Sequence, residues 1–507
     1  MQRINNIKLK LTEDERNLKN IVLRKANIKE KDLKYFSIVK KSVDARDKND
    51  INFVYTVDVS DKSEIPESKP IKVSKNAKIL IVGAGPAGLF CALNLVRAGL
   101  KPIVIERGES VENRSKTVDG FFKTGKLNTE SNIQFGEGGA GTFSDGKLNT
   151  GVSSPLINEV LDDFVKYGAP EDIKYLAKPH IGSDRLPETV KNIRNEIIRL
   201  GGEICFNTKL KDIKLSEGKI VGITADSYET VDDLVLAVGH SARDTFEMLY
   251  GKGVAMEQKP FAVGFRIEHP QREIDFTQYG KSAGNPKLPP ADYRLASHLS
   301  ERGVFTFCTC PGGYVMPAAS EENAVVTNGM SLYKRDGVNA NSAVLCEVRP
   351  SDFGGETPLA GVEFQRRLEK SAYLAGGGEY RAPVQLLGDY IKNRTSEKFG
   401  AVIPTYARGC SFYDLNKLLT EDMNSAIKKG VADFDRRLKG FMKYDAVLTG
   451  IESRSSSPLR ILRTDNLCGV NVTNLYPCGE GCGYAGGIMS AAVDGIRVAL
   501  KIIEKYL

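Results

Sequence analysis

The segment 78–90, KILIVGAGPAGLF, constrains the fold of this chain more than any other part of the sequence. Its apolar run is typical of a buried strand, and a GxGxxG spacing follows at once and opens a helical stretch. Gly83 permits a tight turn, Gly85 lets the backbone approach a ligand, and Gly88 lets helix and strand pack closely. The pattern predicts a βαβ unit whose helix N-terminus binds a pyrophosphate through Gly83, Gly85, Pro86, Ala87 and Gly88.

The next predicted strand lies in KPIVIER, 101–107, and closes at the acidic residue Glu106. Glu106 follows the glycine loop by about 20 residues, the usual place for a carboxylate that accepts adenosine ribose hydroxyls. We expect Arg107 to line the same site. Strand, glycine loop, helix and terminal acid agree, so the segment predicts a dinucleotide site.

A second glycine-rich segment lies at the C-terminus, where 474–503 repeats the order strand, glycine-acid loop and helix. NAD and FAD share the first motif, but FAD is long and its ribityl chain and ring need a second anchor. Glu480 can accept a hydrogen bond from a ribityl hydroxyl, and the helix opening after it directs backbone N–H groups and a positive dipole at the ring. We therefore predict FAD, with contacts from Gly479, Glu480, Gly486, Gly487 and Ile488.

The segment 136–148, GEGGAGTFSDGKL, holds five glycines, and such a run can form an anion-binding nest of N–H groups. We expect it to wrap the pyrophosphate and ribityl chain through Gly138, Gly139, Gly141 and Thr142. Gly239 ends a buried strand and is expected near the adenine half.

The pattern of elements predicts an α/β fold class (α+β overall) with an inserted domain. Short β-like runs between 260 and 350, broken by Gly and Pro, favour an antiparallel sheet. We predict a small basic α/β domain at 1–60, a linker at 61–77, a Rossmann-like FAD-binding domain at 78–260 and 441–507, and between its parts an antiparallel-sheet substrate domain with helices at 261–440.

The net charge of +7 is concentrated near the N-terminus, where residues 1–78 hold 19 Lys and Arg against 12 Asp and Glu. This excess would suit nucleic acid or an acidic partner, but a solvated face of a small domain explains it more simply. No apolar run is long enough to span a membrane, and the charged start lacks a signal-peptide core. Nine scattered cysteines indicate reduced thiols, so we expect a cytoplasmic protein.

Seven stretches carry a resemblance to a known family: VGAGPAGLFCAL, SNIQFGEGGAGTFSDGKLNT, KPHIGSDRL, LAVGHSARDT, FTFCTCPGGYVMPAAS, LTGIESRSSSPLRI and YPCGEGCGYAGG. They span most of residues 78–500, and the chain resembles the FAD-dependent dehydrogenases labelled NAD(FAD)-utilising, within the glutathione-reductase-like two-domain flavoproteins. The resemblance implies FAD and a small α/β domain in front of the flavin domain. Cys482 departs from the small residue usual in that family, which argues against a shared catalytic role for it.

Catalytic candidates are Cys308, Cys310, His240 and Arg454. Cys308 and Cys310 would share one face of a strand that PGG ends, either as core fillers or beside the flavin ring. His240 could move protons or be a satisfied structural residue, and Arg454 could bind a carboxylate through its planar fork or merely solvate a loop. No metal is expected, because the cysteine spacings lack CxxC pairs.

We expect hydride transfer between flavin and a small-molecule substrate. No second GxGxxG follows a strand, so NAD(P)H would serve only as a transient donor without a domain of its own. Two alternatives stay open: an FAD-dependent tRNA-modifying enzyme that docks RNA on the basic N-terminal domain, and a flavin-bearing redox-sensing or interaction protein without turnover.

Overall fold

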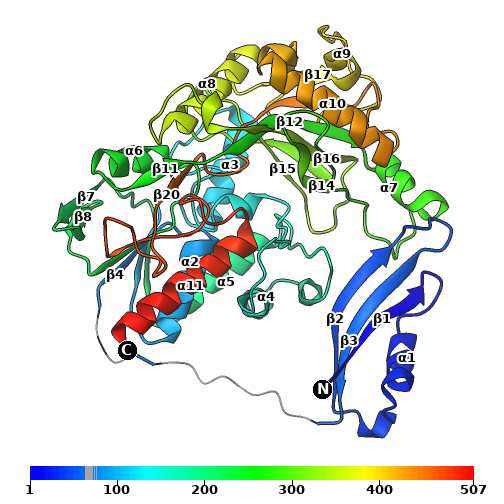
Figure 1. Ribbon diagram of the computed structural model, residues 1–507, viewed down its shortest axis with the longest axis horizontal. Coiled ribbons are helices and arrows are strands. Elements are labelled where there is room, and N and C mark those ends of the chain that lie inside the picture. Colours follow the sequence, from blue (N-terminus) through cyan, green and yellow to red (C-terminus); the bar gives the residue numbers. More distant parts are fainter. Residues whose placement is uncertain (63–71, 74, 76) are drawn as a thin grey trace.

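A five-stranded parallel sheet forms around the buried strand of the glycine motif, in the order β21-β10-β4-β5-β6. The computed structural model describes residues 1–62, 72–73, 75 and 77–507, so most of the predicted linker lies outside the described residues (Figure 1). The last strand of the chain joins the sheet beside β10, which brings the two predicted parts of the FAD-binding domain together. The strands are β4 (Ile79–Val82), β5 (Ile103–Ile105), β6 (Glu203–Cys205), β10 (Asp233–Leu236) and β21 (Leu475–Pro477).

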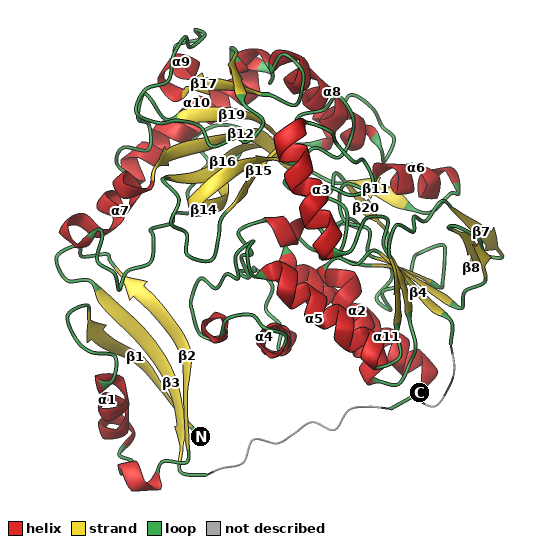
Figure 2. Ribbon diagram, turned by 180° about the vertical axis from the view of Figure 1, so that it is seen from behind, coloured by secondary structure: helices red, strands yellow, loops and turns green. Residues whose placement is uncertain are grey.

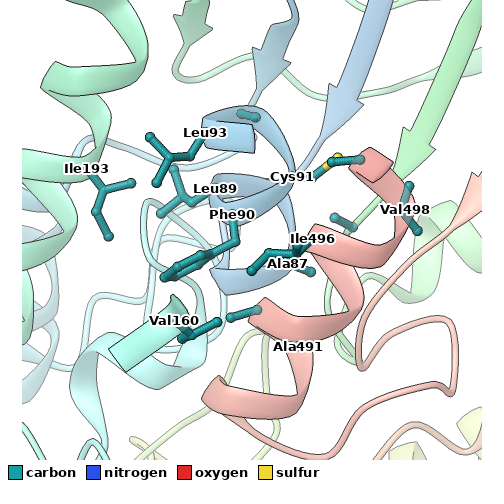
Figure 3. Packing of buried hydrophobic residues seen from close by; sticks show 14 of the residues in the cluster. Ala87, Leu89, Phe90, Cys91, Leu93, Val160, Ile193, Ala491, Ile496 and Val498 are labelled. Atoms are coloured by element: carbon teal, nitrogen blue, oxygen red, sulfur yellow. The ribbon is translucent and has the colours of Figure 1, made fainter. Parts of the chain in front are cut away.

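Helices cover one face of this sheet, and two of them pack unusually closely. A Cβ added at Gly88 would lie 1.9 Å from the carbonyl oxygen of Gly83, and one at Gly495 would lie 2.1 Å from that of Ala87. These glycines let α2 settle on its strand and α11 settle on α2 around the apolar cluster in Figure 3. The helices of this face are α2 (Pro86–Arg97), α4 (Leu156–Lys166), α5 (Leu186–Arg199) and α11 (Ile488–Tyr506).

A second, antiparallel sheet holds the strands β13-β14-β16-β12-β19-β17-β18, with β15 paired to β14. All ten residues of its central strand β12 are buried, and helices α8 and α10 lie on the side away from the parallel sheet (Figures 1 and 2). The strands are β12 (Phe261–Pro270), β13 (Ala296–Ser297), β14 (Val304–Pro317), β15 (Thr327–Met330), β16 (Asn339–Val348), β17 (Ala382–Leu386), β18 (Cys410–Phe412) and β19 (Val447–Glu452). The helices are α7 (Gln271–Tyr279), α8 (Ala360–Ala375), α9 (Leu387–Ile391) and α10 (Glu421–Arg437).

The predicted end of the inserted domain at residue 440 is too early. Strand β19 lies after that point, yet it pairs with β12 and with β17 inside the antiparallel sheet. The stretch 361–440 contains the strands β17 and β18 as well as helices. The chain returns to the parallel-sheet domain through β20 (Leu459–Ile461), which pairs with β11 (Met256–Gln258). Smaller elements of that domain are α3 (Val111–Thr124), β7 (Asp212–Ser216), β8 (Lys219–Thr224), β9 (Tyr228–Glu229) and α6 (Arg243–Gly251).

The N-terminal unit is a three-stranded antiparallel sheet, β1-β3-β2, with one helix packed on it. Its elements are β1 (Gln2–Lys10), α1 (Asn17–Ala26), β2 (Tyr35–Asp44) and β3 (Asn52–Ser60). The unit contacts both other domains: Lys41 in β2 exchanges backbone hydrogen bonds with Tyr175 and Ala177, and the Lys287 ammonium donates to the carbonyls of Leu11 and Glu13. Of the described residues, no helix combines the length and apolarity that a membrane span requires.

Candidate cofactor and active site

One cavity of about 320 Å³ lies between the carboxyl ends of the parallel strands and the antiparallel sheet. Most of the residues predicted from the sequence line it, although they come from seven separate stretches of the chain. They are Gly83, Gly85, Pro86, Ala87, Glu106, Arg107, Gly139, Gly141, Gly239, His240, Cys308, Arg454, Glu480, Gly486, Gly487 and Ile488. The predicted residues Gly88, Gly138, Thr142, Gly479 and Cys310 lie outside this lining.

The glycine loop forms a cradle at one wall of the cavity. Gly83 has a φ of +104°, and a Cβ there would lie 2.4 Å from the Ala237 carbonyl oxygen, so only glycine fits. A Cβ at Gly85 would meet nothing within 4 Å except Gly139 Cα at 3.8 Å, which leaves the space in front of α2 open. Pro86 begins that helix, and the unpaired N–H groups of its first turn face the cavity. This open cradle fits the pyrophosphate of FAD.

Glu106 organises the loops around the adenosine end of the cavity. Its carboxylate accepts hydrogen bonds from the backbone N–H groups of Ala84, Gly108 and Gly136 at 2.8–3.0 Å. A carboxylate offers about four acceptor positions, so one direction remains for a ribose hydroxyl. The Arg107 guanidinium lies 4.4 Å from the centre of the Phe135 ring and donates a hydrogen bond to the Asp244 carboxylate at 2.8 Å. Arg107 and Phe135 both line the cavity wall.

The C-terminal loop supplies the other anchor for the cofactor. Glycines 486 and 487 stand at the start of α11, and a Cβ at either would meet nothing within 4 Å. Burial raises the pKa of Glu480 to about 7, with Lys259 opposing the shift. Among the described residues the Glu480 carboxyl has no hydrogen-bond partner, so it is available for a hydroxyl of the ribityl chain. Both features fit FAD.

Several predicted residues support the cradle from behind. Gly88 packs α2 on its strand, and Gly138 donates its N–H to the Ala84 carbonyl at 2.8 Å. Gly138 and Thr142 line a small neighbouring apolar cavity instead of the main one. Gly479 takes a φ of +77° and donates its N–H to the Asp494 carboxylate at 2.8 Å, which fixes the turn before Glu480.

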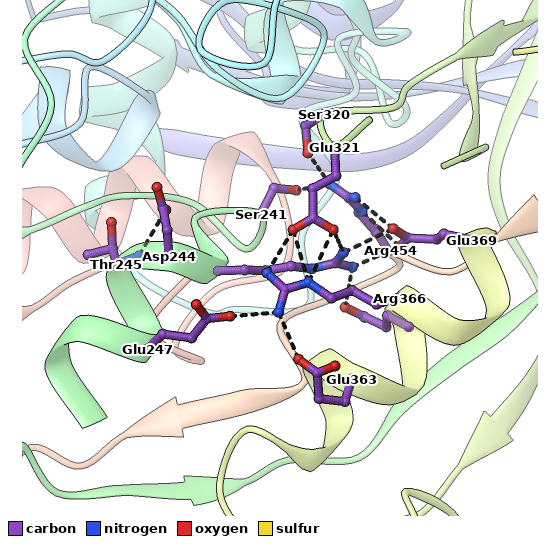
Figure 4. Close-up of polar contacts among 12 residues, drawn as sticks. Ser241, Asp244, Thr245, Glu247, Ser320, Glu321, Glu363, Arg366, Glu369 and Arg454 are labelled. Carbon is purple, nitrogen blue, oxygen red and sulfur yellow. Dashed lines mark hydrogen bonds and ion pairs between the residues drawn. The ribbon is translucent and has the colours of Figure 1, made fainter. Parts of the chain in front are cut away.

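Arg454 lines the cavity, but its fork is already occupied. It donates to both carboxylate oxygens of Glu369 at 2.8–2.9 Å and to the hydroxyls of Ser241 and Ser320 (Figure 4). Glu369 is fully buried and also accepts from Arg243, so the two arginines neutralise one carboxylate between the domains. The structure therefore corrects both readings of Arg454: its fork is a buried tie between domains and not a free carboxylate site or a solvated loop residue.

His240 lines the cavity with a neutral ring. Its Nδ1 lies 3.0 Å from the Ser241 hydroxyl. Burial, and then the positive charges of Arg454 and Arg243, lower the pKa of His240 to about 3. The imidazole is uncharged at neutral pH, so it can accept or donate a hydrogen bond but stores no extra proton.

The two strand cysteines are placed differently from the prediction. The strand β14 does not end at PGG but continues to Pro317, and its pairing with β16 shifts between Phe307 and Cys310. Cys308 sits in that bulge with a φ of +47°, so regular alternation does not hold. Cys308 is half-buried and lines the cavity, whereas Cys310 is fully buried behind it.

Several polar residues of the cavity were missed from the sequence, among them Lys147, Thr327 and Asn328. The Lys147 ammonium lies 3.8 Å from the Asp145 carboxylate, which is already held by Arg335 and Ser331. The Thr327 hydroxyl is buried without a partner among the described residues, and Asn328 stands next to it. Lys147 belongs to the glycine-rich SDGKLNT stretch, which was the available signal. No group of His, Cys, Asp and Glu side chains within the described part of the chain is arranged to hold a metal ion.

Comparisons with known proteins agree with this site. Residues 77–265 match the pyridine nucleotide-disulphide oxidoreductase family, residues 260–455 match the family of FAD-dependent protein, C-terminal domain-like, and residues 1–60 match a domain of unknown function. An uncharacterized protein of Clostridium beijerinckii is 50% identical over 526 residues, covering 99% of each chain.

Solved structures resemble the chain only distantly. The flavin-dependent brominase Bmp2 gives a TM-score of 0.39 at 15% identity, over 85% of this chain and 80% of that one. A flavoprotein/dehydrogenase from Cytophaga hutchinsonii gives 0.35 at 12% identity, over 85% and 78%. The chain belongs to one family with the C. beijerinckii protein, and its two large domains match those of FAD-dependent oxidoreductase-like flavoproteins.

Proposed function

We propose that the protein is a dehydrogenase or reductase that transfers a hydride between FAD and a small organic substrate bound under the antiparallel sheet. The observation that carries this proposal is the cavity between the two sheets, which joins the dinucleotide cradle to a polar wall formed by β14, β15 and the end of β19. FAD supplies the electron chemistry when bound, and the protein supplies position and electrostatics.

The cofactor wall has a role for each of its parts. The start of α2 with Gly85 and Gly139 would hold the pyrophosphate, and Glu106 the adenosine ribose. Glu480 and the start of α11 would hold the ribityl chain and the ring. Bound in this way, the cofactor would have its ring end directed toward the antiparallel sheet.

The substrate wall offers hydrogen-bond donors and one cation. Lys147 has only the shared Asp145 as a counter-charge among the described residues, and the Thr327 hydroxyl lacks a partner. Together with Asn328 they suit a polar or anionic small molecule. The neutral His240 ring can hydrogen-bond to it without adding charge.

A metabolite screen tests this proposal. The purified protein, loaded with FAD and reduced by light under anaerobic conditions, is mixed with small oxidised metabolites while flavin absorbance is followed. We expect one chemical class to reoxidise the flavin faster than buffer does. Lys147→Met should then raise KM for that class at least tenfold, because it removes the cavity cation. Lys174→Met, on an exposed ion pair with Asp162, is the matched control and should leave KM unchanged.

Two outcomes would refute the proposal. Reoxidation by no organic compound would favour the redox-sensing alternative. Identical KM values for Lys147→Met and wild type would remove the substrate from this wall.

A further inference from the structure

Cys308 and Cys310 form an unusual pair at the boundary between cavity and core. A bulge in β14 turns the backbone at Cys308 into the left-handed region, which non-glycine residues seldom adopt and which recurs at functional sites. Arg266, itself fully buried, donates a hydrogen bond to the Cys308 carbonyl at 2.8 Å and so holds the bulge in place. One thiol therefore faces the cavity and the other lies directly behind it.

The bulge brings the two thiols within reach of each other. In a regular strand, residues i and i+2 stand about 6.6 Å apart, near the upper limit of about 6.8 Å for the Cα atoms of a disulfide. The backbone at Thr309 sets that span, and the pairing of β14 with β16 is irregular between Phe307 and Cys310. The Cys310 thiol already donates to the Cys308 carbonyl at 3.3 Å, and both cysteines are free.

The surroundings favour a thiolate on the cavity side of the pair. The Cys310 thiol, Lys147 and Arg266 lower the pKa of Cys308, against burial and the nearby Asp145 carboxylate. The pKa of Cys310 is raised by the adjacent Cys308 sulfur and by burial. Glu452 also faces this group, but Arg266 pairs with it at 2.5–2.9 Å. These surroundings favour the thiolate at Cys308 over the thiolate at Cys310.

Five of the other seven cysteines lack both features. Burial raises the pKa of Cys91, Cys346, Cys410, Cys478 and Cys482. None of the five lines the cavity.

We propose that Cys308 and Cys310 are a second redox centre that exchanges two electrons with FAD across the cavity. The inference rests on the cofactor position in the proposed function. In the oxidative direction an S–S bond forms between the Cys308 thiolate and the Cys310 sulfur. The pair gives up two electrons and the single Cys310 proton, which FAD takes up to become its anionic two-electron-reduced form. In the reverse direction the same electrons and proton cleave the S–S bond, leaving Cys308 as thiolate and Cys310 as thiol.

Thiol mapping tests the pair without catalytic turnover. FAD-loaded protein is treated with diamide, denatured in iodoacetamide and digested with trypsin. The fragment 303–334 contains Cys308 and Cys310 and no other cysteine. We expect this fragment to be unalkylated and lighter by two hydrogen atoms after oxidation, and doubly alkylated after dithiothreitol. Cys346, on the neighbouring strand β16, should be alkylated in both samples.

Electron counting tests the exchange with FAD. Anaerobic dithionite titration of the diamide-treated holoenzyme should consume twice as many electrons per flavin as Cys308→Ser or Cys310→Ser, while Cys346→Ser matches wild type. Full alkylation of fragment 303–334 after diamide, or flavin-only electron uptake by wild type, would overturn the proposal. If a serine variant loses FAD, the wild-type fragment mass and electron count still decide.

The two failures are distinguishable. Loss of the second redox centre leaves reoxidation by a metabolite intact. Loss of the proposed function leaves the doubled electron uptake with no reoxidising metabolite.

Discussion

Replacing Glu369 by Gln should destabilise the joint between the two large domains. The Glu369 carboxylate accepts five hydrogen bonds, two each from Arg243 and Arg454 and one from Ser453, at 2.7–3.0 Å. Its side chain is fully buried, and those of the two arginines are 1% and 3% exposed. Gln keeps the shape but removes the charge, so the buried Arg454 loses its carboxylate partner and Arg243 keeps only Glu321.

The cost of breaking such a buried pair is about 3–5 kcal/mol. For domains of 150–250 residues each kcal/mol lowers Tm by about 2–4 °C, which gives an expected fall of about 6–20 °C. Far-UV circular dichroism and flavin fluorescence, followed together on heating, measure it. Glu363→Gln is the matched control, because Glu363 binds the outer Arg366 of the same network and its side chain is 55% exposed (Figure 4). It should cost less than about 1 kcal/mol.

The difference in Tm between wild type and Glu369→Gln should depend on pH in one direction. The two arginines hold the pKa of Glu369 far below its usual range, so the ion pair contributes fully above the unfolded pKa of about 4.3. The Tm difference between wild type and Glu369→Gln should be constant from pH 8 to about 5 and should narrow in stronger acid. A Glu369→Gln Tm equal to that of Glu363→Gln would refute the assigned role of the carboxylate.

Three further predictions concern cofactor and partners. Gly85→Val should fold normally but bind FAD about 5–150-fold more weakly, since overpacking costs about 1–3 kcal/mol. Gly120→Val, at a position with open space around it, should bind FAD as wild type does. Equal flavin content of the Gly85→Val and wild-type proteins, measured by absorbance, would contradict the prediction. NAD(P)H should reduce the flavin slowly in anaerobic stopped-flow, and micromolar half-saturation would reveal a missed nicotinamide site. Filter binding should detect no tRNA affinity at physiological salt, and salt-sensitive binding would favour the RNA-modifying alternative.

Local chemistry made the cofactor half of the site predictable from sequence. The backbone at Gly83 has a positive φ, and at Gly88 there is no room for a Cβ. Both requirements arise within one βαβ unit, so the residue types and their spacing are enough to predict them. The same holds for Gly486 and Gly487 at the start of α11. Glu106 was placed correctly in the cavity, but its three bonds to loop N–H groups depend on how distant loops fold around it.

The part of the cavity under the antiparallel sheet is formed by contacts between residues far apart in the sequence, which no local sequence pattern predicts. Arg454 meets Glu369 across 85 residues, so its fork looked free in the sequence. Strand β19 pairs with β12 although a long stretch of chain separates the two strands, and for this reason the domain boundary was predicted in the wrong place. The bulge at Cys308 arises from the register between β14 and β16. The prediction for the two cysteines assumed a regular strand, because the sequence gives no sign of that register.

Burial, and after it the arginine pair between the domains, lowers the pKa of His240 and so determines how the ring responds to acid. A base whose folded pKa lies below its unfolded value of about 6.5 binds its proton only on unfolding, so its contribution lowers stability as pH falls below about 6.5. At pH 5.5 this amounts to about 1 kcal/mol, from one pH unit at 1.36 kcal/mol. His240→Gln should therefore lose less Tm between pH 7 and 5.5 than wild type, while His298→Gln, at a histidine outside the cavity, should not differ from it. An unchanged slope for His240→Gln would mean that the ring keeps an ordinary pKa in the folded protein and can take up a proton there.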